Sequence, residues 1–241
     1  MILIRAADME KRMNISHSSN RRRMIAGVSL IGLSVGFLSN TLTGLMTRPA
    51  SPTQTMIALA GFLSILNCVL MTASMLGLSQ LLRAGADRVG LLGAAFALIG
   101  WAASMRILTV IHLDTVIHAG VEGVPPSALG SVFNSAPALF LSIFPVGLFF
   151  PLGLITLGLA LFWWRPLNRW LGLLLALGGV LFPVGRAAGI ESALTACDIV
   201  LAVAFAAIGW QILTRPEVWE ATSSESETVN TTLLSELRAG A

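Results

Sequence analysis

Long apolar runs separated by short polar joints make up most of this chain. The runs are too continuously apolar for the amphipathic helices of a soluble protein. Each is long enough to cross about 30 Å of hydrocarbon as a helix that rises 1.5 Å per residue. The pattern therefore predicts an all-α integral membrane bundle of six transmembrane helices, over residues 24–46, 55–82, 89–112, 136–164, 167–185 and 190–213.

The two ends of the chain differ from the apolar centre. Residues 1–23 are polar and basic. The apolar run that follows them is too long for a signal peptide and has no small-residue cleavage site, so we expect a retained helix. Residues 214–241 are rich in Ser, Thr and Glu, which is typical of a disordered tail. The expected organisation is a basic arm over 1–23, a transmembrane domain over 24–213 and a tail over 214–241.

The composition supports a membrane protein. Hydrophobic residues make up 55% of the chain and charged residues only 11%, whereas soluble domains carry about a quarter charged residues. The net charge of +3 is concentrated at helix ends and in the arm. Membrane lipids are therefore the expected partner, and nucleic acid is not.

The basic residues also predict an orientation. With the N-terminus inside, the outer side carries only Arg48 and Arg186, whereas the inner side carries the six basic residues of the arm together with Arg83, Arg88, Arg165, Arg169 and Arg215. This asymmetry predicts that both termini lie in the cytoplasm and that the protein resides in the cell (inner) membrane. Four tryptophans would then lie at the inner interface: Trp163, Trp164, Trp170 and Trp210.

Small residues recur every three or four positions on two of the segments. The first stripe consists of Gly32, Gly36, Asn40 and Gly44, and the second of Gly93, Ala97, Gly100 and Ser104. Such stripes allow helices to approach closely. We expect them to serve contacts within one chain rather than a homodimer.

Three stretches carry a resemblance to known proteins. They run from Ala26 to Gly44, from Arg165 to Gly172 with its Pro-x-x-Trp-Leu-like entry to the fifth segment, and through Ile208-Gly209-Trp210. On these stretches the chain resembles a group of uncharacterised six-helix bacterial membrane proteins classed as a domain of unknown function. The resemblance implies the architecture and supplies no activity.

Charged residues inside the membrane are costly and mark function. Arg106 lies about 16 residues, or roughly 24 Å, from the inner end of the third segment, and Asp198 lies roughly 12 Å from the outer end of the sixth. A long arginine side chain can bridge that difference in depth, so we expect an Arg106–Asp198 ion pair. The alternative is that each charge reaches water separately. Glu191 shares a helical face with Asp198, and Arg186 is a competing partner for Glu191.

A second polar cluster, His112, Asp114, His118 and Glu122, follows the third segment in what we expect to be an outer loop. Histidine and carboxylate groups can bind zinc or another divalent metal. The cluster contains no H-E-x-x-H motif, and a helical continuation would direct His112 away from the other three. A solvated polar loop is the alternative interpretation.

Asn40 and Asn67 complete the buried polar residues. Interhelical hydrogen bonds explain both without a ligand, but convergence with Arg106 and Asp198 would create a pocket that opens outward. No Ser-His-Asp order, phosphate loop or dinucleotide fingerprint is present. No cofactor is expected, since His17 and His112 lie on opposite sides of the membrane and cannot share a haem.

Three functions are compatible with these features. The first is a non-enzymatic multi-pass membrane protein that binds or moves a small ligand, ion or lipid through an outer-half pocket formed by the third, fifth and sixth segments. The second is a small metal-dependent membrane enzyme that uses His112, Asp114 and His118. The third is a scaffold subunit that anchors a partner complex.

Overall fold

The structure is a computed structural model. It describes the backbone of residues 2–46, 54–120, 146–188 and 191–220, and within these ranges the side chains of residues 18–39, 41, 59, 62, 63, 65–83, 85–103, 146–185 and 192–220. Across this part of the chain the fold is all-helical and contains no strand. The predicted all-α class is therefore confirmed.

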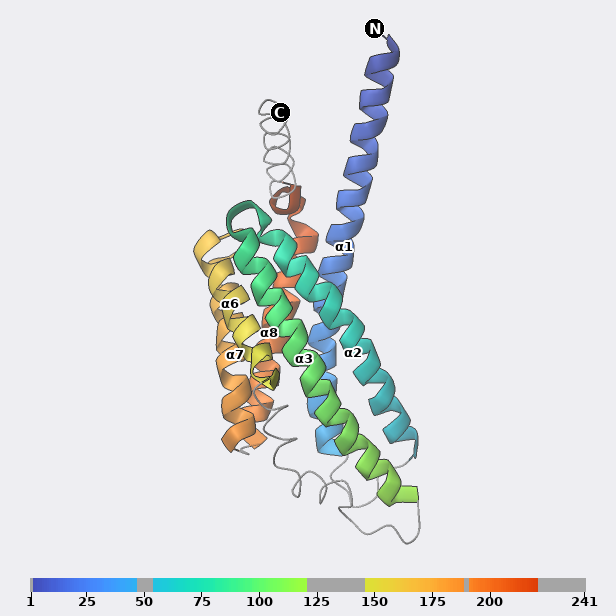
Figure 1. Cartoon of the computed structure of the whole chain (residues 1–241), viewed down its shortest axis with the longest axis vertical. Helices are drawn as coiled ribbons and strands as arrows, with labels where there is room; N and C mark the ends of the chain where they lie inside the picture. The colour runs from blue at the N-terminus through green and yellow to red at the C-terminus, as the bar shows by residue number, and fades with distance from the viewer. Residues whose placement is uncertain (1, 47–53, 121–145, 189–190, 221–241) are drawn as a thin grey trace, which may run out of the picture.

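Within the described ranges, six long helices run roughly along one direction (Figure 1). They are α1 (Ile2–Met46), α2 (Gln54–Leu81), α3 (Arg83–Gly120), α6 (Phe149–Trp164), α7 (Arg169–Ala188) and α8 (Glu191–Thr214). Within α3 the backbone leaves helical geometry at Ala86 (φ −146°, ψ 43°), so the first residues of that helix form a separate turn after α2.

The helices form a closed ring. Going around the ring, α1 contacts α2, followed by α3, α6, α7 and α8, and α8 returns to α1. Two glycines make the closing contact close, because a methyl group at Gly209 would lie only 2.7 Å from the carbonyl oxygen of Gly27. The first and last helices of the domain are therefore neighbours.

The outside of the ring is apolar. Large side chains that are more than half exposed include Val35 on α1, Phe62, Ile65 and Val69 on α2, and Val203 on α8. A continuous apolar exterior is typical of a protein surrounded by lipid. Three stretches are long and apolar enough to cross a membrane: Ser18–Ser39, Gly85–Ala103 and Ser192–Thr214. These findings support a transmembrane protein.

Three helix boundaries differ from those expected. Helix α1 begins at Ile2, so the basic arm is helical; no Gly or Pro interrupts the chain before Gly27. Helix α3 continues to Gly120 through the expected outer loop, because no Gly or Pro occurs between Gly100 and Gly120. Residues 216–220 are also helical, and Trp219 is only 5% exposed, so this part of the expected tail belongs to the folded bundle.

The described glycines of both small-residue stripes lie in contacts within the chain, as predicted. A methyl group at Gly36 would overlap the side-chain amide of Asn67 on α2, and one at Gly100 would overlap the backbone nitrogen of Phe150 on α6. From the opposite side, Gly153 of α6 faces the backbone of α3. The absence of a β-carbon is therefore what brings these helix pairs together.

Candidate functional site

Five aromatic side chains cross the interior of the ring, and we call them the aromatic layer: Phe37, Trp101, Phe150, Phe182 and Phe205. The ring centroids are 6.0 Å apart for Phe37 and Trp101, 5.7 Å for Phe37 and Phe205, 5.1 Å for Trp101 and Phe150, and 4.7 Å for Phe150 and Phe182. None is more than 6% exposed. The layer joins α1, α3, α6, α7 and α8 at one depth.

A hydrogen bond between α1 and α8 lies on one side of this layer. The hydroxyl Oγ1 of Thr41 donates to Oδ2 of Asp198 at 2.9 Å. Thr41 is one turn beyond Phe37, and Asp198 is seven residues, or about two turns, from Phe205. Hydrogen bonds to a carboxylate are stronger than those between neutral groups. The bond therefore holds the acidic side chain between the two helices that close the ring.

Two further polar groups lie at the depth of the layer. Asn67 is 3% exposed on α2, in the space that Gly36 leaves open. The indole Nε1 of Trp101 is buried and has no hydrogen-bond partner among the described residues. Leaving such a donor unsatisfied costs about 1–3 kcal/mol, so the unpaired N–H marks the layer as a place where an acceptor would be stabilised.

The other side of the layer is mostly apolar, with small buried polar side chains at Ser29, Ser34, Ser74 and Ser79. Its fully buried residues include Leu30, Leu33, Leu78, Leu157, Leu161 and Ile208, with at most 2% exposure. Cys197 lies on the Asp198 side, buried, with its Sγ 3.5 Å from the carbonyl oxygen of Gly178. Both cysteines are free thiols. The carboxylate of Asp198 thus lies on one side of the aromatic layer, and leucines with a few buried serines fill the other.

Two of the predicted ligand-binding side chains, Asp198 and Asn67, are described by the structure. They lie on different neighbours of α1: Asp198 bonds Thr41, whereas Asn67 packs against Gly36. The side chains of Asn40, Arg106, Arg186 and Glu191 lie outside the described residues. The Arg106–Asp198 ion pair therefore stays a prediction.

The predicted metal ligands His112, Asp114 and His118 also have side chains outside the described part. Their backbones belong to α3, so Asp114 and His118 occupy positions four residues apart on a continuous helix rather than a loop. Among the side chains that are described, no group of three His, Cys, Asp or Glu residues could hold a metal ion.

The sequence did not single out Thr41 or the aromatic layer. Thr41 is neutral, and nothing in its spacing distinguishes it from other threonines in apolar helices. The five aromatic residues come from five helices, so only the arrangement of the ring brings them together.

No family model, no curated protein and no solved structure matches this chain. The resemblance to the six-helix group stays a prediction. The functional argument therefore depends on the geometry around Thr41 and Asp198.

Proposed function

We propose that this chain is a six-span protein of the cell membrane, with both termini in the cytoplasm, that binds a small ligand or ion in its outer half beside Asp198. Helix lengths support spans beyond the three long apolar stretches: α2 has 28 residues and α7 has 20, enough for about 30 Å, while the 16 residues of α6 cover about 24 Å. The exposed arginines and tryptophans of the α6–α7 turn support placing that end at the inner interface.

The Thr41–Asp198 hydrogen bond is the observation that carries the proposal. An acidic residue within the membrane is costly, and such residues mark ligand and ion pathways. A neutral residue at position 198 could hold α8 against α1 at a lower desolvation cost. We take the carboxylate as a group that helps to bind the ligand, beside its contact with Thr41.

The aromatic layer favours binding over an open pore. Its rings are in contact and buried on the inner side of Asp198, so the layer forms the floor of the proposed site. A ligand entering from the outer side would meet Thr41 and Asp198 first. The free N–H of Trp101 offers a further donor at the floor.

Thiol labelling tests whether the site opens outward. In full-length protein with Cys68→Ser and Cys197→Ala, the Thr41→Cys variant should react with a membrane-impermeant methanethiosulfonate added outside cells. The matched control is Ser34→Cys. Ser34 is seven residues before Thr41 on the same side of α1, 5% exposed, and on the far side of Phe37. It should react at least about tenfold more slowly, because the layer separates it from the outer solution.

Each outcome of the labelling has a defined meaning. If the Thr41→Cys variant reacts only with reagent supplied on the cytoplasmic side, the proposed orientation is rejected. If that variant does not react from either side, an open site is rejected and the scaffold hypothesis, in which Asp198 only holds α8 to α1, is favoured.

A further inference from the structure

The turn between α6 and α7 is held rigidly by hydrogen bonds. The backbone N–H of Arg165 donates to the carbonyl of Leu161 at 3.1 Å and ends α6. Asn168 begins α7, because its side-chain Oδ1 accepts from the N–H of Trp170 at 3.2 Å. The N–H of Asn168 in turn donates to Oε1 of Gln211 on α8 at 3.1 Å. The turn is therefore fixed to a third helix.

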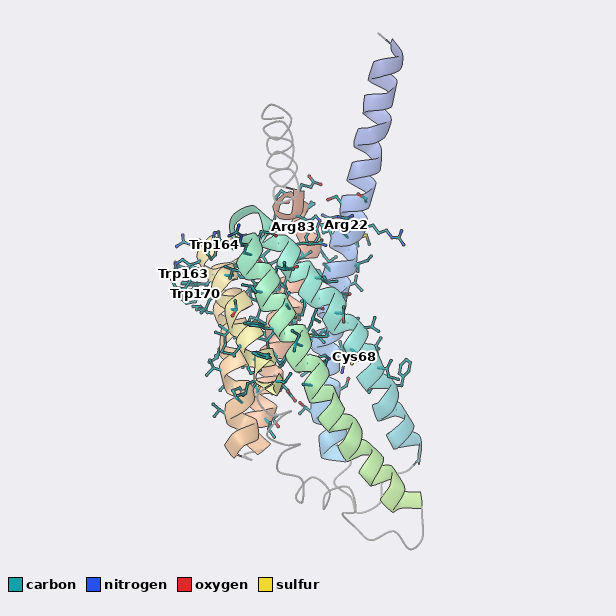
Figure 2. The ribbon with its side chains drawn as sticks, viewed as in Figure 1. Arg22, Cys68, Arg83, Trp163, Trp164 and Trp170 are labelled. Carbon is teal, nitrogen blue, oxygen red and sulfur yellow. The ribbon has the colours of Figure 1, made fainter. Side chains whose placement is uncertain are left out.

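This rigid turn presents tryptophan and arginine side chains to its surroundings. Trp163 and Trp170 are 67% and 61% exposed, and Arg165 and Arg169 are exposed beside them. The guanidinium carbon of Arg169 lies 5.1 Å from the ring centroid of Trp170, within the range of a cation–π contact. Figure 2 shows Trp163, Trp164 and Trp170 gathered at one corner of the bundle, with Arg22 across the same end on α1.

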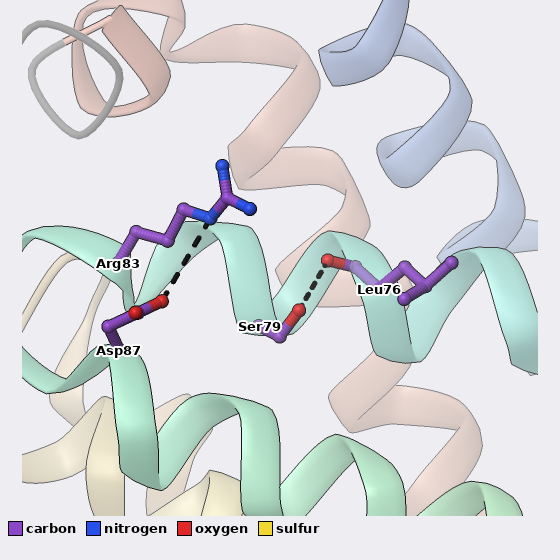
Figure 3. A network of polar contacts seen from close by, with 4 residues as sticks. All are labelled: Leu76, Ser79, Arg83 and Asp87. Carbon is purple, nitrogen blue, oxygen red and sulfur yellow. Dashed lines mark hydrogen bonds and ion pairs between the residues drawn. The ribbon is translucent and has the colours of Figure 1, made fainter. Parts of the chain in front are cut away.

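The positive charge of the turn is not neutralised locally. No acidic residue occurs between Trp163 and Leu171, and among the described side chains neither arginine pairs with a carboxylate. The neighbouring α2–α3 turn is different, because the Nε of Arg83 lies 3.9 Å from Oδ1 of Asp87 (Figure 3). An anion is therefore favoured at the α6–α7 turn.

Arg165 is also an unusual residue for its backbone conformation. Its φ of 54° and ψ of 38° are left-handed, and Arg165 is the one non-glycine residue with positive φ among the described residues. Glycine adopts this conformation without steric cost and is the preferred residue at a helix end of this kind. The turn alone therefore gives no reason for an arginine at position 165.

We propose that the α6–α7 turn is a binding site for the phosphate group of an anionic phospholipid. Arg165 and Arg169 donate to the phosphate oxygens, because the guanidinium group matches phosphate geometry. Trp163 and Trp170 lie against the lipid at the level of its polar headgroup, where indole rings are enriched. A phospholipid fits better than free phosphate because the exposed indoles contact its apolar part. The inference is independent of the ligand site beside Asp198.

Fluorescence quenching tests the proposal. The full-length protein is reconstituted into phosphatidylcholine vesicles that contain increasing fractions of brominated phosphatidylglycerol or, in parallel, brominated phosphatidylcholine. Bromine quenches tryptophans that it contacts, so the brominated anionic lipid should quench more strongly at equal fraction. Arg165→Gly with Arg169→Gln should lower the relative binding constant for phosphatidylglycerol roughly tenfold.

The variants separate a lipid site from a structural role and from general surface charge. Arg165→Gly relieves the left-handed conformation, so the thermal midpoint in phosphatidylcholine should stay the same or rise. Arg169→Gln alone leaves the backbone of Arg165 unchanged and should lower the relative binding constant for phosphatidylglycerol about threefold. Arg21→Gln with Arg22→Gln removes the same charge from exposed positions on α1. This variant should keep the preference for phosphatidylglycerol over phosphatidylcholine.

Three results would overturn the site. The first is equal quenching by the two lipids in the unaltered protein. The second is an unchanged preference for phosphatidylglycerol in Arg169→Gln and in the double variant Arg165→Gly with Arg169→Gln. The third is that Arg21→Gln with Arg22→Gln loses as much of this preference as the double variant. Equal quenching would leave an acidic protein partner as the alternative occupant of the turn.

Discussion

Replacing Phe150 with alanine should lower the free energy of unfolding by about 3–5 kcal/mol. Phe150 is fully buried and contacts Trp101 on α3 and Phe182 on α7. In lipid, helices are held together mainly by close side-chain contacts, which the truncation removes. The effect is measured as a shift in the unfolding transition of the purified protein in one fixed detergent.

Phe62→Ala is the matched control for this substitution. Phe62 is 62% exposed on the outer face of α2, so the same truncation should change the unfolding free energy by less than about 1 kcal/mol. Equal destabilisation by the two variants would show that the aromatic layer is no more important to stability than the lipid-facing surface.

Gly100→Val should destabilise the protein by about 3 kcal/mol, or prevent assembly of α3 with α6. A β-carbon at Gly100 would meet the backbone nitrogen and Cα of Phe150 and the carbonyl carbon of Phe149, and these atoms cannot rotate away. The two helices would have to separate, and contacts along their whole interface would loosen. Thermal inactivation in detergent measures the loss as a lower transition temperature.

Ala102→Val provides the comparison on the same helix. Ala102 is exposed and lies two residues after Gly100, so it receives the same β-branched side chain without meeting α6. Its transition temperature should stay close to that of the unaltered protein. A drop as large as that of Gly100→Val would mean that valine weakens α3 itself rather than its contact with α6.

The helical architecture could be predicted because apolar length is a local property of the sequence. The expected start of the second segment at residue 55 differs from the observed start of α2 at Gln54 by one residue. The ends of α3 were harder to place, because hydropathy falls after His112 while the backbone has no reason to leave the helix before Gly120. Trp219 was assigned to the tail because the residues around it in the sequence are mostly polar. One large apolar residue does not change that average composition, although its ring is buried in the structure.

The candidate site was only partly accessible from the sequence. Asp198 stood out because a charge in an apolar helix is rare. Its described partner, Thr41, did not, because a hydroxyl group adds little to the polarity of a helix and the two residues are 157 positions apart. Contacts of this range depend on which helices become neighbours, and the order of the ring cannot be read from hydropathy.

The contact between α1 and α8 has a consequence for how the protein is made. Helices leave the ribosome in order, so among the six described helices α1 enters the membrane first and its partner α8 last. Until then, the faces of Gly27 and Thr41 that α8 will cover stay open, and the ring cannot close. Asp198 thus meets Thr41 only after the other five described helices have been synthesised. A chain that stops before α8 would lack the site altogether and would expose an unclosed edge to membrane quality control.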